Sequence, residues 1–259
     1  MGCVFFLILV EEKTGEKIFG NGIKYMLIEL AIGDAYGAGF EFVDQQTIQL
    51  YNNLKGYIKH PHHDIGPGCY TDDTQMSLAV AEAIVSRKLW TPELLATKFV
   101  AAFHRDRRLG IENATIQAAI THNIPDGIKA AIAAALMSHY FIYQLGLKKN
   151  LGNFLEQHVP GEWSIPWQGE VSTKGVVCVR AAITAVMLHD SMSKLLQACI
   201  AFSGDVDTVA TIALAAGSCS IEIAQDLPEN LVQGLENQSY GRDYIRGLDR
   251  QLMNCRSDF

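Results

Sequence analysis

Runs of alanine and other small apolar residues constrain the fold of this chain more than any other sequence feature. Two of them, at 130–135 and 213–216, combine high helix propensity with side chains small enough for helices to pack closely. From residue 24 onward the apolar residues recur mostly with a helical period, and the alternation typical of strands is sparse. We therefore expect an all-α fold, with helices at 25–32, 75–87, 92–104, 125–144, 176–189, 194–202, 208–223 and 240–252.

The length and composition favour one large domain. The chain has 259 residues, of which 49% are hydrophobic, and it contains no linker, solenoid repeat or low-complexity tract. We place the domain at 23–259, after an N-terminal extension at 1–22 to which the sequence assigns no role. The apolar run at 4–10 has no basic flank and is far shorter than the roughly 20 residues of a membrane span, so we expect no membrane association.

Charge and cysteine usage narrow the class of protein further. A net charge of −7 argues against general nucleic-acid binding, because neutralising phosphates requires a basic face. The six cysteines form no C-x-x-C pair, which predicts the reducing cytoplasm and gives no support to a zinc site. We expect a cytoplasmic monomer.

Two short acidic clusters are the strongest functional signal. One reads Thr-Asp-Asp-Thr at 71–74 and the other Gly-Asp-Val-Asp-Thr at 204–208, and each opens a run of small and apolar residues. A single Asp or Thr at a helix start is ordinarily an N-cap. Each cluster supplies more oxygen atoms than a cap requires, and four carboxylates in a helical core would repel one another unless a cation neutralised them.

The side chains in these clusters indicate the kind of cation. Carboxylate and hydroxyl oxygens without His or Cys suit Mg²⁺ or Mn²⁺, and adjacent aspartates can bridge two ions that hold a water or orient a substrate. A third segment, at 33–42, contains glycines that allow helices to approach closely. It also contains Glu41, which stands between two aromatic residues, and such a setting would raise the pKa of its carboxyl.

The three segments together resemble the ADP-ribosylglycohydrolases. The resemblance rests on Gly-Asp-x-x-Gly at 33–37 with Glu41, Tyr-Thr-Asp-Asp-Thr-Gln-Met at 70–76 and Gly-Asp-x-Asp-Thr at 204–208, and it extends from residue 24 to the C-terminus. It implies an orthogonal multi-helix, all-α single domain with a centre of two Mg²⁺ or Mn²⁺ ions. The ligands it implies are Thr71, Asp72, Asp73, Asp205, Asp207 and Thr208.

The resemblance also implies the reaction and the residues that meet the substrate. The substrate would be an ADP-ribosylated protein or a small-molecule ADP-ribose conjugate, cleaved at its glycosidic bond. Glu41 occupies the position of the family's mobile acid beside the metals. Either Asp73 or Glu41 would transfer the proton in the reaction. His122 would contact the diphosphate or ribose, with Gly204 also in the substrate-binding set, although His122 taken alone is more typical of a helix-end cap.

One departure from the family pattern favours a second interpretation. Relatives carry a stretch of small residues ending in Met-Arg that helps to cradle ADP-ribose, whereas here the chain passes directly from Arg108 into 109–117. Because misplacing a substrate by about an ångström can cost on the order of a hundredfold in rate, a shortened wall would weaken catalysis. The alternative function is therefore an ADP-ribose-binding protein with lost or reduced catalysis. Two loop tryptophans, Trp163 and Trp167, are candidates to stack on adenine or to pack on the core.

Overall fold

The structure is a computed structural model that describes residues 26–89, 91–105 and 125–255. These residues form helices and no strand apart from two isolated bridges, so the all-α expectation is confirmed. The helices are α1 (Leu27–Ala38), α2 (Gln45–Tyr51), α3 (Asp72–Val85), α4 (Pro92–Arg105), α6 (Pro125–Ile142), the 3₁₀ turn η1 (Lys148–Asn150), α7 (Leu151–His158), α8 (Gly175–Leu188), α9 (Met192–Ala201), α10 (Val206–Ser218), α11 (Glu229–Gly234) and α12 (Arg242–Cys255).

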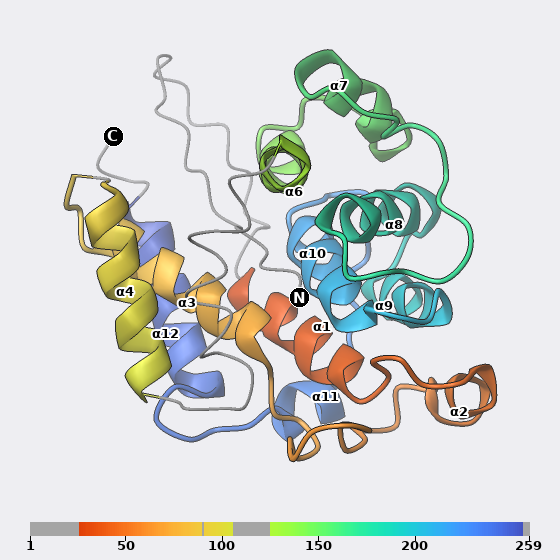
Figure 1. Ribbon diagram of the computed structural model, residues 1–259, viewed down its shortest axis with the longest axis horizontal. Coiled ribbons are helices and arrows are strands. Elements are labelled where there is room, and N and C mark those ends of the chain that lie inside the picture. Colours follow the sequence, from red (N-terminus) through yellow and green to blue (C-terminus); the bar gives the residue numbers. More distant parts are fainter. Residues whose placement is uncertain (1–25, 90, 106–124, 256–259) are drawn as a thin grey trace.

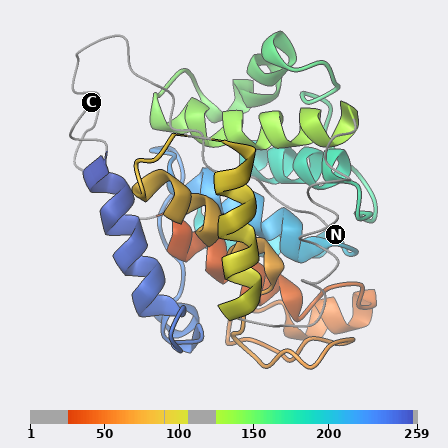
Figure 2. The ribbon, with the colours of Figure 1, turned by 60° about the vertical axis from the view of Figure 1, so that its left-hand side comes forward.

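Helices α1 and α10 form the centre of the molecule (Figure 1). On one side of this pair lies α3, which packs against α1, α4 and α12. On the other side α8 and α9 pack against α10, and α6 lies along α8 (Figure 2). The two acidic segments therefore begin helices that both contact α1.

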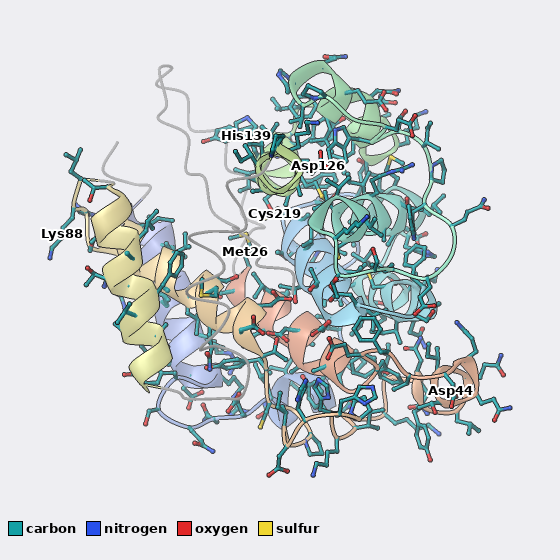
Figure 3. The ribbon with its side chains drawn as sticks, viewed as in Figure 1. Met26, Asp44, Lys88, Asp126, His139 and Cys219 are labelled. Carbon is teal, nitrogen blue, oxygen red and sulfur yellow. The ribbon has the colours of Figure 1, made fainter. Side chains whose placement is uncertain are left out.

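The central pair is antiparallel and very closely packed. At one end the Sγ of Cys219 lies 3.8 Å from the Sδ of Met26, and the two side chains meet in the middle of the molecule (Figure 3). At the other end a Cβ atom on Gly37 would collide with the backbone of Asp207, and one on Gly33 would collide with the backbone of α10 farther along. The glycines thus permit the close approach that the sequence suggested, and they lie within α1, which runs six residues beyond its expected end.

The structure adds short elements that the apolar pattern did not reveal. Helices α2, α7 and α11 have eight residues or fewer, which gives too few turns for a period of 3.6 to be recognised. The region between α7 and α8 is without helix, as expected. None of the helices in the described ranges is long and apolar enough to cross a membrane. The extension at 1–22 lies outside the described residues.

The start of α1 is capped by a residue of α12. Met26 occupies the N-cap position but provides no side-chain cap, and the backbone N–H groups of Met26, Leu27 and Ile28 donate to the carboxylate of Asp249 at 3.0–3.3 Å. Burial raises the pKa of Asp249 to about 6. Burial, helped by the charge of Asp249, also raises the pKa of nearby Glu29 to about 7. The interface of α1 and α12 therefore holds two carboxyl groups that resist ionisation.

This interface predicts a pH dependence of stability. A carboxyl whose pKa is higher in the folded state takes up a proton on folding, so Glu29 should lower the unfolding free energy as the pH rises from about 4.5 to about 7. We expect Glu29→Gln to leave stability unchanged near pH 5 and to raise it near pH 8, by about 3 kcal/mol at most. Urea unfolding at both pH values with a chelator present measures the effect. The exposed Glu162→Gln is the control, and an equal gain in that variant would contradict the prediction.

Candidate active site and metal centre

The two acidic clusters occupy equivalent places at the N-termini of α3 and α10. Thr71 and Asp205 stand at the N-cap positions, and Asp73 and Asp207 are the second residues of their helices. The first turn of a helix carries a partial positive charge, which favours carboxylates there. Because α10 runs antiparallel to α1, its N-terminus lies beside the end of α1, from which the chain continues to Glu41.

Asp34, in the interior of α1, fixes the start of α3. Its carboxylate is 0% exposed and accepts four hydrogen bonds. The donors are the backbone N–H and hydroxyl groups of Thr71 and Thr74, and the two hydroxyls lie 2.8 and 2.6 Å from Asp34 oxygens. Burial raises the pKa of Asp34 to about 6, against the opposing effect of these bonds. The sequence placed Asp34 in the family motif without a role, and its position within an apolar helix was the available signal.

A hydrogen bond joins the two acidic clusters directly. The hydroxyl of Thr208, in α10, donates to the Oδ2 of Asp73, in α3, at 2.9 Å. Both residues are buried. Burial, together with the charges of Asp72, Asp34 and Asp205, raises the pKa of Asp73 well above its ordinary value. The carboxylates from the two halves of the chain are therefore close enough to influence one another, as the sequence predicted.

Two carboxylates stand at the start of α10, and one of them has an oxygen without a hydrogen-bond partner among the described residues. Asp205 occupies the N-cap position of α10 but its side chain makes no cap hydrogen bond, and its Oδ2 lies 3.5 Å from the Sγ of Cys178. The Oδ1 atom of Asp207 is buried and has no hydrogen-bond partner among the described residues. Burial, then the charge of Asp205 and those of Glu41 and Asp73, raise the pKa of Asp207 well above its ordinary value. These features make Asp207 a candidate cation ligand.

Gly204 shapes the loop that leads into α10. Its φ of 87° lies in the left-handed region, and a Cβ atom there would collide with the carbonyl oxygen of Val171. The N–H of Asp205 donates to that carbonyl at 3.0 Å, and the carbonyl of Gly204 accepts the N–H of Phe42 at 3.0 Å. The glycine therefore anchors the residue next to Glu41, and its role in substrate binding stays a prediction.

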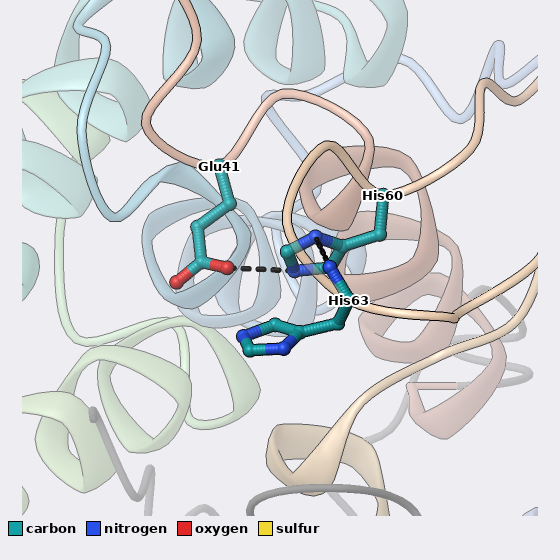
Figure 4. A group of neighbouring side chains, drawn as sticks. All are labelled: Glu41, His60 and His63. Atoms are coloured by element: carbon teal, nitrogen blue, oxygen red, sulfur yellow. Dashed lines mark hydrogen bonds and ion pairs between the residues drawn. The ribbon is translucent and has the colours of Figure 1, made fainter.

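Glu41 lies at the edge of the acidic cluster. One of its carboxylate oxygens is within 4.8 Å of carboxylate oxygens of Asp205 and Asp207. Its Oε2 accepts a hydrogen bond from the Nε2 of His60 at 2.7 Å (Figure 4). Burial acts to raise the pKa of Glu41, but the hydrogen bond from His60, with smaller electrostatic contributions, outweighs it, so the pKa is lowered. The expectation of a raised pKa was wrong because the sequence did not show that His60 would meet Glu41.

The other predicted substrate contacts have mixed outcomes. Trp163 is 1% exposed and its Nε1 donates to the carbonyl of Val159 at 3.0 Å, so it packs in the core and cannot stack on adenine in this structure. The ring of Trp167 is half-buried, with the guanidinium of Arg180 5.4 Å from its centroid. His122 and the shortened segment after Arg108 lie outside the described residues.

Sequence comparison decides the family. A sequence model of the family described as ADP-ribosylglycohydrolase matches residues 19–110 and 95–258. The chain belongs to the ADP-ribosylglycohydrolase family. Membership supports a glycohydrolase type of function.

Two further comparisons show proteins that are similar to this member of the ADP-ribosylglycohydrolase family. A solved structure described as an ADP-ribosylglycohydrolase-related protein complex superposes with a TM-score of 0.65 at 17% identity, covering 89% of this chain and 96% of the other, which shows the shared fold. A protein of Archaeoglobus fulgidus (strain ATCC 49558 / DSM 4304 / JCM 9628 / NBRC 100126 / VC-16), described as uncharacterized, is 26% identical over 195 residues. That match spans 73% of this chain and 60% of the relative's length.

Proposed function

We propose that the protein is a metal-dependent hydrolase that cleaves the glycosidic bond of an ADP-ribosylated protein or a small-molecule ADP-ribose conjugate. The observation that carries this proposal is the buried, unpartnered Oδ1 of Asp207 within a group of carboxylates drawn from three parts of the chain. Family membership supports the class of reaction.

The acidic cluster fits hard divalent cations. The Asp, Glu and Thr side chains that meet here offer oxygen, the kind of ligand preferred by Mg²⁺ and Mn²⁺. Cys178, which contacts Asp205, is the one sulfur nearby among the residues described above. Two such ions would offset the burial and the repulsion that raise the pKa values of Asp73 and Asp207, and would give the unpartnered oxygen of Asp207 a partner. The residues that would hold them are Thr71, Asp72, Asp73, Asp205, Asp207 and Thr208, with Glu41 beside them.

The residues of the chain divide the chemical work between them. When bound, the ions supply positive charge that polarises a water and the ribose hydroxyls. Asp34 holds the N-terminus of α3, and with it Asp73, in a fixed place. Glu41, whose pKa is lowered, would accept the proton from the attacking water on the oxygen that His60 leaves free. Asp73 is less suited to this step because it is one of the residues that would hold the ions.

The decisive experiment follows the product. We expect the protein to release free ADP-ribose from ADP-ribosylated Arg or Ser peptides in the presence of Mg²⁺ or Mn²⁺, at about 1 per second or faster if it is an ordinary enzyme. Chromatography measures the release, and a chelator is the control. If the protein binds ADP-ribose but does not release it from the peptides, the proposal is contradicted and the binding-protein alternative is favoured. The shortened segment after Arg108 is the reason for considering that alternative.

A further inference from the structure

The loop between α2 and α3 contains three histidines, of which His60 is buried. The Nδ1 of His60 accepts the backbone N–H groups of His62 and His63, at 3.1 and 3.3 Å. The side chain thus closes its own turn, in the way that an Asn or Asp side chain closes an Asx turn. These two bonds hold the imidazole ring in one orientation.

The same two bonds determine which nitrogen of His60 carries the proton. A neutral imidazole has one N–H donor and one acceptor, and Nδ1 faces two donors, so the network assigns the proton to Nε2. Nε2 points at Glu41 and lies 2.7 Å from its Oε2 (Figure 4). The backbone of the loop therefore fixes a donor on the face of the ring that meets the acid.

A metal site at this place is the competing interpretation. Ligand atoms of Glu41, His60 and His63 all lie within 4.8 Å of one another, as in a site for a transition metal. A metal on Nε2 of His60 would have to displace the proton that Nε2 carries. A histidine that binds metal ordinarily donates its other N–H to an acceptor, whereas here the other nitrogen is itself the acceptor of two N–H groups. The hydrogen bonding around His60 is therefore that of a donor to Glu41.

The charge around Glu41 shows why a donor is needed there. Asp205 and Asp207 present carboxylate oxygens within 4.8 Å of a Glu41 oxygen, and like charges at that distance repel. The Glu41 side chain is 21% exposed, so it has room to turn towards solvent. The backbone around Glu41 is held by the bond from the N–H of Phe42 to the carbonyl of Gly204 and by the turn bond from the N–H of Val43 to the carbonyl of Phe40, neither of which fixes the side chain.

We propose that His60 is a positioning residue for Glu41: by holding one carboxylate oxygen, it keeps the Glu41 carboxylate beside Asp205 and Asp207. The consequence for turnover rests on the proposed function, but the arrangement itself does not. Figure 4 shows the second oxygen of Glu41 directed away from His60. In this arrangement the proton acceptor is in place before the substrate arrives.

A pair of variants separates the two roles of His60. In His60→Asn the side-chain carbonyl can still accept the N–H groups of 62 and 63 but is too short to reach Glu41. In His60→Gln an amide N–H can still reach Glu41, but the turn loses its acceptor. We expect His60→Asn to lower kcat by about ten- to a hundredfold with little change in KM, and His60→Gln to recover most of that loss. We also expect His60→Asn to have no further effect on kcat in the background of Glu41→Gln, because both act on the same step.

Two readouts keep the inference separate from the proposed function. Proton–nitrogen correlation spectra of protein with ¹⁵N-labelled histidine should show His60 protonated on Nε2, whether or not the protein turns over substrate. Protonation on Nδ1 would overturn the inference, as would unchanged kcat in His60→Asn with wild-type thermal stability. A Zn²⁺ affinity in calorimetry that falls tenfold or more in His63→Ala would show a metal site instead. Absence of ADP-ribose release by the wild type, with the Nε2 proton observed, would overturn the proposed function alone.

Discussion

Asp207→Asn is expected to abolish the thermal stabilisation of the protein by Mg²⁺ or Mn²⁺. The wild type should gain roughly 2.7 kcal/mol of unfolding free energy at a metal concentration a hundredfold above Kd, because the metal binds only the folded state. The variant replaces one oxygen of the buried carboxylate with an amide NH₂ group, and it removes a negative charge that a cation would need. Metal-dependent release of ADP-ribose should disappear with it.

In the absence of metal, the same variant is expected to be as stable as the wild type or more stable. Burial and neighbouring charges raise the pKa of Asp207 well above its ordinary value, so removing its charge relieves repulsion. Thermal melts with and without metal measure both effects. Asp44→Asn, which removes an exposed carboxylate at the start of α2, is the control and should keep the full metal response. Equal metal-induced shifts in wild type and Asp207→Asn would rule out the proposed centre.

Asp34→Ala is expected to cost on the order of 4 kcal/mol of unfolding free energy. The substitution leaves four buried donors on Thr71 and Thr74 without their acceptor, and each unsatisfied buried group costs about 1–3 kcal/mol, with incomplete additivity. The freed N-terminus of α3 should also lose its hold on Asp73, so metal affinity should fall as well. Urea unfolding and metal calorimetry measure the two losses.

An ordinary helix cap supplies the comparison for Asp34. Asp44 accepts the N–H of Thr47 at 2.7 Å at the exposed start of α2, and Asp44→Ala should cost only the small stability of an exposed helix cap. A loss in Asp34→Ala no larger than in Asp44→Ala would show that the buried network adds nothing beyond capping.

The main helices and the meeting of the acidic clusters could be predicted from the sequence. Alanine-rich apolar periodicity identifies long helices reliably because it repeats over several turns, as in α6 and α10. The segments at 71–74 and 204–208 each contain more side-chain oxygen atoms than an N-cap needs. The sequence therefore predicted that some of these oxygens meet a partner outside their own helix. The beginnings of α3 and α10 were placed two or three residues late, because the acids are part of the first turn rather than before it.

The supporting contacts could not be predicted, because they join residues that are distant in the sequence and belong to different elements. Asp34 looked like one member of a motif, and only the packing of α1 on α3 makes it an acceptor for two threonines. The direction of the pKa shift of Glu41 depends on His60, which is in a loop without periodicity. In both cases the residue types were visible, but the partner was not.

The capping of α1 by Asp249 has a consequence for the stage of synthesis at which α1 can be capped. Asp249 lies 222 residues beyond Leu27, so the N–H groups at the start of α1 have no acceptor from α12 until nearly all of the described chain has been synthesised. Contacts of such long range form late in folding because the loop must close first. Since α1 holds Asp34 and leads to Glu41, a growing chain would fix the start of this helix only after α12 has been synthesised, and products truncated before α12 would lack the cap.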